Sequence, residues 1–409
     1  MACLRQNPGS FLSICLFFSL LSCAKEKFTE WDFSHRITVV ESSGEKCRSF
    51  PVSFNLPGER LVGEGKLNPD YNDIRITMAG AEVPCQIEKP DDGQVKVTFQ
   101  IDLEPGETRD DVTLYYGNPS APELRFDRSW GSISPQMDGL ENSLFKITFG
   151  VKTGTYGKKW GCQNGFIIKK YEEDQFGGDL IPDSWGKSRN DVTYWRENVP
   201  ARIHAIEADG PVFKTVLFQT DSLVSDDHGL LTNLTQRVTI YKDCPFIREE
   251  YRNIKGAVVD ACTPGGMPLR SDGERNFNFI ALNFDSQEIT WNGIGDDHGT
   301  RGGWDYRKSR ADTDARYRYL DDYTYHGHFM MGVINIHNNR GVASCVWADH
   351  IRTCYFSDWD HDRAAYSLWP RTVGRMTRYL YYVENGREEA VSWAKLLAQP
   401  PRLTVRDLK

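Results

Sequence analysis

The strongest constraint on this chain is a series of short segments in which apolar and polar residues alternate. In QVKVTFQIDL, residues Val95, Val97, Phe99 and Ile101 fall on one face of a strand, because side chains alternate with a period of two. Similar segments between Trp31 and about Pro122 are ITVVES, SFPVSFNL, DIRITMA and VTLYYGN. Gly, Pro, Asn and Asp separate them, as turn residues do. Five or more strands at this spacing predict a β-sandwich.

A second β-rich region follows a polar passage at residues 123–142, which we interpret as a linker. Its predicted strands include LFKITFGV, RIHAIEADGPVFKTVLFQTD, LTQRVTIYKDCPFIREEYRNI, NFIALNF, FMMGVINIH and RYLYYVEN. One helix is predicted at Arg387–Gln399, where acidic residues stand in the first turn and Pro400-Pro401 follows.

The N-terminus predicts export. Arg5 precedes the apolar run SFLSICLFFSLL, which has the length of a signal h-region and is too short to span a bilayer. The run ends in LLSC, which resembles a bacterial lipobox. We therefore expect a signal peptide at residues 1–22 and a lipid on Cys23, with an ordinary secretory signal as the alternative. The expected product is an outer membrane lipoprotein, periplasmic or at the cell surface, held only by its lipid because no other apolar run is long enough to cross.

Length, charge and cysteine content set further limits. A chain of 409 residues favours two domains, and a net charge of −8 argues against nucleic acid as the main partner while allowing a local basic pocket. Of the ten cysteines, Cys3 and Cys15 leave with the signal, and seven remain besides Cys23. Cys47 and Cys85 form the most natural disulfide candidate in an oxidising compartment.

Three motifs carry a family resemblance in the N-terminal region. WDFSHRITV, the DIRI at Asp73–Ile76 and VTLYYGNPSA at Val112–Ala121 resemble the DUF2341 family of extracellular β-sandwich modules, over residues 28–122. Such modules accompany secreted carbohydrate-active or adhesive proteins, and the resemblance implies no catalytic residues. Trp31, Tyr115 and Tyr116 suit sugar stacking, but core positions are the favoured interpretation.

The second region is similar to galactose-mutarotase-like supersandwich domains, which occur in polysaccharide lyases and glycoside hydrolases. The similarity lies in EADGPVFKTVLF followed by QRVTIYKDCPFIREEYRNI. The predicted fold is therefore all-β: an N-terminal β-sandwich followed by a larger antiparallel β-supersandwich at residues 143–409, with one C-terminal helix.

Candidate chemistry gathers in one window. Six of the nine histidines lie between His298 and His361, beside Arg, Tyr, Trp and paired Asp residues. Aromatic faces stack on sugar rings, while Asp, His and Arg hydrogen-bond hydroxyls and anionic groups. The partner we expect is therefore a glycan, and the Arg and Lys residues favour an anionic one.

The favoured reaction is β-elimination at a uronic acid. It requires a cation against the carboxylate, a base for the α-proton and an acid for the leaving oxygen. DDHGTR and YHGH supply these residue types. We assign His326 or Tyr325 as base, Arg301 as neutraliser and His298 as acid or substrate orienter, with Asp297 beside them.

Two alternatives stay open. One is a glycoside hydrolase with Asp297 among its acids, since Asp residues are abundant but no pair stands out. Glu249 and Glu250, at the end of a predicted strand, join those carboxylates. The other is a surface protein that binds glycan without turnover.

Further substrate contacts are expected from residues flanking this window and from a second Gly-rich loop, GTYGKKWGCQNG. The substrate-binding candidates are Trp304, Tyr156, Lys158, Trp160, Arg202, His204, His328, Trp359, His361 and Arg375. The favoured chemistry requires no cofactor, although DWDHD at Asp358–Asp362 resembles an oxygen-rich loop that could hold Ca²⁺.

Overall fold

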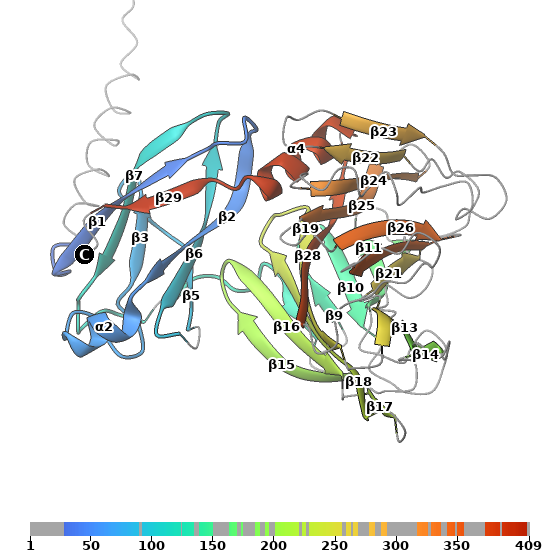
Figure 1. Ribbon diagram of the computed structural model, residues 1–409. Coiled ribbons are helices and arrows are strands. Elements are labelled where there is room, and N and C mark those ends of the chain that lie inside the picture. Colours follow the sequence, from blue (N-terminus) through green and yellow to red (C-terminus); the bar gives the residue numbers. More distant parts are fainter. Residues whose placement is uncertain are drawn as a thin grey trace, which may run out of the picture. The chain divides into compact units, whose positions relative to one another are not determined.

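The computed structural model divides the chain into two compact units, residues 1–127 with 400–409 and residues 128–399 (Figure 1). The structure describes residues 28–89, 92–123, 125–134, 139–149, 163–169, 173–174, 185–188, 193–195, 201–220, 223–225, 229–255, 259–262, 265–268, 278–282, 288–292, 317–325, 329–336, 342–347, 350–355, 373–384 and 387–406. Nearly all described elements are antiparallel strands, and the described residues form two helices. The all-β prediction is confirmed.

The first unit is built from two sheets. One has the order β29-β1-β7-β3-β4 and the other β2-β6-β5. The strands are β1 (Phe33–Val40), β2 (Cys47–Leu56), β3 (Arg75–Met78), β4 (Ala81–Val83), β5 (Cys85–Glu88), β6 (Val95–Leu103), β7 (Thr108–Tyr116) and β29 (Arg402–Val405). The short helix α2 (Gly58–Gly63) follows β2.

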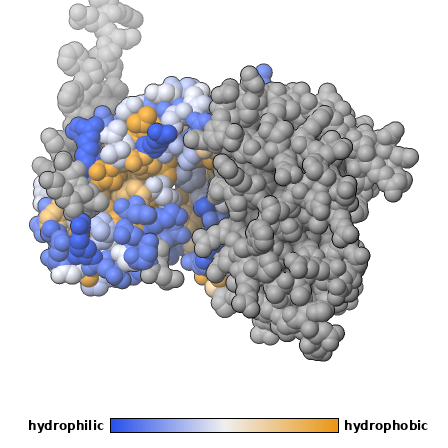
Figure 2. Space-filling view, in the orientation of Figure 1, coloured by the Kyte–Doolittle hydropathy of each residue, from blue (hydrophilic) through white to orange (hydrophobic). Residues whose placement is uncertain are grey.

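The alternation in β6 is borne out by burial. Val95, Val97 and Phe99 are fully buried and Ile101 is 1% exposed, so one face of this strand belongs to the core. Ile37, Val39, Val112 and Leu114 supply fully buried side chains from the other sheet. Figure 2 shows hydrophobic residues of this unit gathered in a band, with hydrophilic residues on either side.

The three motifs that resemble DUF2341 meet around one buried aspartate. The Asp73 carboxylate accepts hydrogen bonds from the amides of Asn68 (3.1 Å) and Gly117 (2.9 Å), while the Trp31 indole donates to the Asp73 carbonyl (2.9 Å). Gly117 has φ +89°, and a Cβ there would lie 2.6 Å from the Phe33 ring, so glycine is required. Arg75 lies 5.6 Å from the Trp31 ring.

The aromatic residues of this module mostly serve its packing. Tyr116 is 3% exposed and stacks on Phe33, with ring centroids 5.1 Å apart. Tyr115 is half-buried and stacks on Phe28 at 4.6 Å, and Trp31 lies 5.2 Å from the same ring. These contacts support the packing interpretation over sugar stacking.

Cys47 and Cys85 are both buried free thiols, so the disulfide expected between them is absent. Cys47 pairs with Leu103 of β6, whereas Cys85 pairs with Phe99 on the opposite side of that strand. The two cysteines thus flank β6 on different sides, four residues apart along it. A disulfide requires Cα atoms within about 7 Å of each other, which this register does not allow.

The second unit contains a large sheet with the order β15-β16-β18-β19-β28-β25-β24-β22-β23, with β17 paired to β18. Its strands are β15 (Ala201–Asp209), β16 (Phe213–Thr220), β17 (Leu223–Ser225), β18 (Gly229–Tyr241), β19 (Phe246–Lys255), β22 (Asn278–Leu282), β23 (Glu288–Asn292), β24 (Tyr317–Tyr325), β25 (Phe329–Ile336) and β28 (Val373–Val383).

Three smaller sheets complete this unit. Their strands are β8 (Ser132–Ile133), β9 (Gly139–Glu141), β10 (Phe145–Phe149), β11 (Gln163–Ile168) and β12 (Glu173–Asp174) in one, β13 (Trp185–Ser188), β14 (Thr193–Trp195) and β20 (Val259–Cys262) in another, and β21 (Gly265–Pro268), β26 (Val342–Trp347) and β27 (His350–Tyr355) in the third. β8 and β9 lie inside the stretch that we interpreted as a linker.

The predicted C-terminal helix is confirmed as α4 (Arg387–Ala398), which packs against β24, β25 and β28 (Figure 1). After it, β29 pairs with β1, with Ile37 opposite Val405 and Val39 opposite Leu403. The sequence reasoning assigned all of residues 143–409 to the second domain, whereas this last strand belongs to the first unit. An isolated four-residue strand carries too little pattern to reveal its partner.

Candidate functional site

One face of the large sheet carries polar side chains on four neighbouring strands, and we call it the polar face. Cross-strand pairs define it, because residues directly opposite each other project from the same side. Thr215 of β16 pairs with Thr239 of β18, Thr239 with Arg248 of β19, and Arg248 with Tyr379 of β28. In the next row Arg237 pairs with Glu250, and Glu250 with Thr377.

The opposite face is covered. Val216, Val238, Ile240 and Ile247 are fully buried there, and Lys214 is 2% exposed. The Lys214 ammonium lies 5.2 Å from the ring of Trp130, which immediately precedes β8. Asn142, after β9, donates to the carbonyls of Tyr241 (3.1 Å) and Cys244 (3.4 Å). The sheet containing β8 and β9 is therefore joined to this side, whereas the polar face includes the solvent-exposed side chains of Arg237 (50%) and Glu250 (35%).

Exposure on the polar face increases along the strands, away from α4. Phe246 is 1% exposed and contacts Trp393 of α4 edge-on, at 5.2 Å. Two residues further along β19, the Arg248 side chain is 29% exposed, and the Glu250 side chain is 35% exposed. On β18 the exposed fraction is 6% for Thr239 and 50% for the Arg237 side chain. The polar face thus runs from an aromatic core at one end to solvent at the other.

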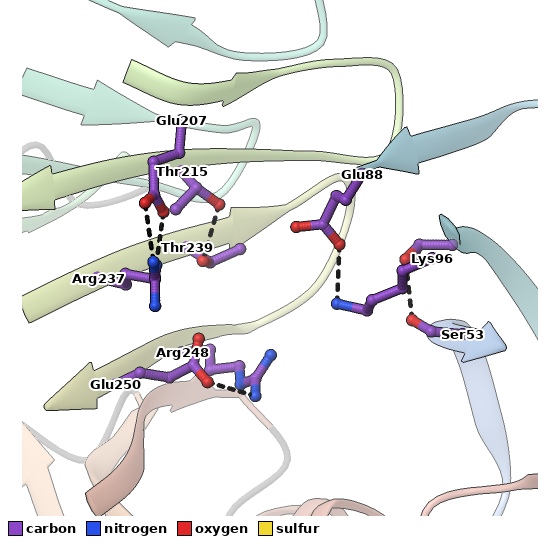
Figure 3. Close-up of polar contacts among 10 residues, drawn as sticks. Ser53, Glu88, Lys96, Glu207, Thr215, Arg237, Thr239, Arg248 and Glu250 are labelled. Atoms are coloured by element: carbon purple, nitrogen blue, oxygen red, sulfur yellow. Dashed lines mark hydrogen bonds and ion pairs between the residues drawn. The ribbon is translucent and has the colours of Figure 1, made fainter. Parts of the chain in front are cut away.

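Two ion pairs hold the guanidinium groups of this face (Figure 3). Arg237 binds the Glu207 carboxylate through both Nε (2.7 Å) and an Nη nitrogen (3.0 Å), an arrangement that fixes the guanidinium plane. Arg248 donates from Nη2 to Glu250 at 2.7 Å. Between these pairs, the hydroxyls of Thr215 and Thr239 are hydrogen-bonded at 2.9 Å.

Arg248 is also flanked by two phenols. Burial raises the pKa of Tyr241 and of Tyr379 above the ordinary value, although Arg248 acts in the opposite direction on both. Burial acts to lower the pKa of the Arg248 guanidinium group. The interactions with Tyr241, Tyr379 and Glu250 act more strongly in the opposite direction, so this pKa lies above its usual range. The Arg248 Nε is buried and has no hydrogen-bond partner among the described residues.

This arrangement can bind an anionic or hydroxyl-rich ligand. A guanidinium with a fixed orientation suits carboxylate and sulfate oxygens, and threonine hydroxyls both donate and accept. The Tyr379 hydroxyl is protonated at neutral pH, as a phenol of ordinary pKa already is, and can donate a hydrogen bond. Among the described residues, no group of His, Cys, Asp and Glu is arranged to hold a metal ion.

Most of the residues assigned to the site from sequence lie outside the described residues. They are His298, Asp297, Arg301, His326, His328, Trp304, Tyr156, Lys158, Trp160, Trp359 and His361, together with Asp358–Asp362 and Cys23. Their roles stay predictions.

Four assigned residues lie on described strands, at known register positions. Arg202 pairs with Gln219, and Arg375 pairs with Arg252; both positions belong to the polar face. A register irregularity separates Ile203 from Ala205, so His204 falls at a bulge. The two-residue period that grouped His204 with Arg202 does not hold across that bulge.

Tyr325 occupies a position of the opposite face. Tyr325 pairs with Phe329 of β25. The next residue, Met330, pairs with Val383 of β28, which is on the same face as Tyr379. Phe329 and Tyr325 are therefore on the other face. The backbone register therefore separates Tyr325 from Arg375, although both were assigned to one site.

Sequence reasoning missed Arg237, Arg248 and Tyr379. The signal available was alternation in QRVTIY and FIREEY, which places the charged residues on one side of each strand. Alternation also separates Glu249 from Glu250, which we had grouped together. Glu249 is fully buried on the covered face, whereas Glu250 lies on the polar face.

Comparisons with solved structures show where this fold recurs. A protein of glycosyl hydrolase family 38 from Enterococcus faecalis matches 96% of this chain with a TM-score of 0.60 at 13% identity. An alpha-mannosidase from Enterococcus faecalis V583 also matches 96%, with a TM-score of 0.58 at 14% identity. This chain spans about half the length of each, 50% and 49%. At such identities the similarity establishes a shared fold.

The neighbours also include a galactose mutarotase related enzyme from Lactobacillus acidophilus, 12% identical over 60% of this chain and 96% of the other. Its TM-score is 0.28, which is too low to support an argument. No protein-family model matches the sequence, so membership of DUF2341 stays a prediction. No curated protein sequence matches it significantly.

Neither helix in the described part of the chain has the length and hydrophobicity of a membrane span.

Proposed function

We propose that this protein acts on a glycan that binds along the polar face of its large sheet. The observation that carries the proposal is the oriented pair of guanidinium groups, Arg237 and Arg248, whose side chains are 50% and 29% exposed on the polar face. Sugars offer the matching groups, since hydroxyls pair with Thr and Tyr and carboxylates pair with Arg. The shared fold with two carbohydrate-active proteins supports the same partner class.

The reaction we favour is β-elimination at a uronic acid. A base removes the proton α to the carboxylate, a double bond forms as the bond to the glycosidic oxygen breaks, and an acid protonates that oxygen. We assign the base to His326, the neutralising cation to Arg301, and the role of acid or substrate orienter to His298. Tyr325 is the less favoured base, because its register position belongs to the face opposite Arg375.

The test is incubation of the purified protein with a panel of uronate-containing glycans, following the ultraviolet absorbance of the conjugated unsaturated product. Elimination predicts a rise in absorbance that is lost in Arg301→Ala and His326→Ala. His337→Ala is a matched control, because His337 lies in the same histidine-rich window but outside the DDHGTR and YHGH motifs. A flat trace for every glycan would reject elimination.

A glycoside hydrolase is the second candidate, and the comparisons favour it, because family 38 and an alpha-mannosidase share the fold. Hydrolysis would release new reducing ends without the absorbance change, and Asp297→Asn should abolish their release. Because this chain spans half of those neighbours, binding without turnover is a third outcome. In that case His326→Ala would lower affinity, with no product formed by either protein.

We further propose that the protein is exported and anchored by a lipid on Cys23. Cys23→Ala should release the mature protein from the membrane fraction, and mass spectrometry of the N-terminal peptide tests for the lipid directly. If Ca²⁺ occupies the Asp358–Asp362 loop, chelation should lower thermal stability, and added Ca²⁺ should restore it.

A further inference from the structure

The polar face contains a row of residues that crosses five strands and includes three arginines. Arg202 of β15 pairs with Gln219 of β16, Gln219 with Thr235 of β18, Thr235 with Arg252 of β19, and Arg252 with Arg375 of β28. We call these five positions the arginine row. Since strands lie about 4.8 Å apart, the row extends across roughly 19 Å of the sheet.

The row comes directly after the exposed residues of the polar face along two of its strands. Thr235 is two residues from Arg237, whose side chain is 50% exposed, and Arg252 is two residues from Glu250, whose side chain is 35% exposed. Exposure rises from Phe246 through Arg248 to Glu250, and Arg252 is the next position of β19 on the same face.

Charge in this region is opposite to that of the chain. The polar face and the row together contain five arginines, namely Arg202, Arg237, Arg248, Arg252 and Arg375, whereas the chain has a net charge of −8. Glu207 and Glu250 on this face already bind Arg237 and Arg248. The five positions of the row contain no carboxylate.

Arg252 and Arg375 occupy directly opposed positions. Like charges at opposed positions of a strand pair destabilise a sheet, and an anion bound there would offset that cost. Arginine donors match the oxygens of a carboxylate or a sulfate, so two opposed arginine positions suit one oxyanion. The spacing to Arg202, about three strands from Arg252, matches a second anionic group on the same extended ligand.

We propose that the arginine row is an anion-binding subsite that holds successive acidic groups of a polyanionic glycan. The inference rests on the proposed function in that the ligand is a glycan. It adds that the glycan carries several charges and extends across the strands. The shared chemistry is an oxyanion, either the carboxylate of a uronate or a sulfate ester.

The experiment measures the affinity of the full-length protein for three probes at low and high NaCl: an oligogalacturonate, a dextran sulfate oligomer and a neutral dextran oligomer of similar length. Wild-type protein should bind at least one anionic probe, and salt should weaken that binding. Arg252→Gln and Arg375→Gln should each weaken it by about tenfold and reduce its salt dependence. Arg60→Gln is the matched control, since Arg60 is an exposed arginine on α2 of the first unit.

The three probes separate the possible ligands. If the row variants lose affinity only for the oligogalacturonate, the row binds uronates. If they lose affinity only for dextran sulfate, it binds sulfate esters. Row variants that bind both anionic probes as wild type does, with unchanged salt dependence, would overturn the proposal, as would an equal loss of the neutral probe. If a Gln variant lowers the melting temperature, Arg252→Lys and Arg375→Lys replace it. Lysine keeps the positive charge but not the planar guanidinium group, so we expect an intermediate loss of affinity.

The binding test of the arginine row does not depend on turnover. If the absorbance assay shows cleavage but the row variants bind as wild type does, the proposal for the row is rejected and the proposed reaction stands. Charge-dependent binding without any product would keep the row and reject elimination.

Discussion

At the scale of single residues, Glu41 shows how one buried acid connects two turns of the first unit. It is 2% exposed, and its carboxylate accepts the amides of Ser43 (2.5 Å), Gly44 (2.9 Å) and Gly106 (2.8 Å). Burial acts to raise its pKa, but the hydrogen bonds from Ser43, Gly106 and Gly44 outweigh it, and the pKa is lowered. Because the folded-state pKa lies below the unfolded value, the stabilisation is present above the unfolded pKa and is lost as the pH falls through the folded pKa.

Glu41→Gln should therefore destabilise the first unit at neutral pH, by about 1–3 kcal/mol, because the amide cannot accept from all three backbone donors. Hydrogen exchange of the turn peptides around Ser43 and Gly106 should accelerate at pH 7. The difference from wild type should shrink in acid, where the wild-type carboxylate is protonated. Equal exchange in both proteins at pH 7 would contradict this role.

Cys47 and Cys85 are predicted to be inert thiols. Burial raises the pKa of each to about 12, with nearby carboxylates adding to the effect at Cys47. The nucleophilic thiolate is then scarce at neutral pH. Neither should react with iodoacetamide in the native protein at pH 7.5, whereas both should react in denaturant without a reductant. Native labelling at either position, read by peptide mass spectrometry, would show that the site opens.

At the scale of elements, α4 is held on the sheet by an aromatic cluster rather than by its own propensity. Trp393 is 8% exposed and contacts Phe246, which in turn contacts Tyr241 at 5.6 Å and Tyr379 at 5.6 Å. The cluster ends where Arg248 and the polar face begin. Packing of α4 thus supports the backbone on which the candidate site stands.

Trp393→Ala should destabilise the second unit by about 3–5 kcal/mol, because a large buried side chain leaves a cavity. Glu388→Gln, on the exposed first turn of the same helix, should cost under about 1 kcal/mol. Denaturant unfolding of both variants measures the difference. A cost for Trp393→Ala no larger than that of the control would mean that α4 packs loosely.

At the scale of the whole molecule, strands from the N-terminal and the C-terminal parts of the chain pair in the first unit. β29 pairs with β1 over four residue pairs, and Arg406 donates to Thr38 (3.1 Å) and to Asp110 (3.1 Å). The chain therefore leaves the first unit, forms the second and returns to complete the first. Without β29, β1 would become an edge strand with unpaired backbone groups.

Deletion of residues 400–409 should destabilise the first unit while leaving the large sheet of the second intact. Amides of β1 should exchange faster, and those of β18 and β19 should keep their protection. Deletion of residues 407–409 alone, which spares β29 and Arg406, is the control. Unchanged exchange in β1 after the longer deletion would show that the strand pairing is dispensable.

Local pattern alone determined much of this protein. Alternation predicted many of the strands of both units and the buried series Val95, Val97, Phe99 and Ile101, and the acidic start and following prolines predicted α4. These features depend on residues close in sequence, so the chain displays them directly. It also singled out Arg202 and Arg375 as candidate ligand contacts, which stay predictions, without showing that they share one row of the sheet.

The tertiary structure decided what depends on partners far along the chain. Alternation separates Glu249 from Glu250, but only the covering of one face by Trp130 and Asn142 decides which of them is accessible. Strand order placed Arg202, Arg252 and Arg375 in one row, kept Cys47 apart from Cys85, and brought β29 back to β1. Hydrogen-bonded pairing joins strands without regard to their separation in sequence, and a pattern with a period of two defines two faces without stating which one meets solvent.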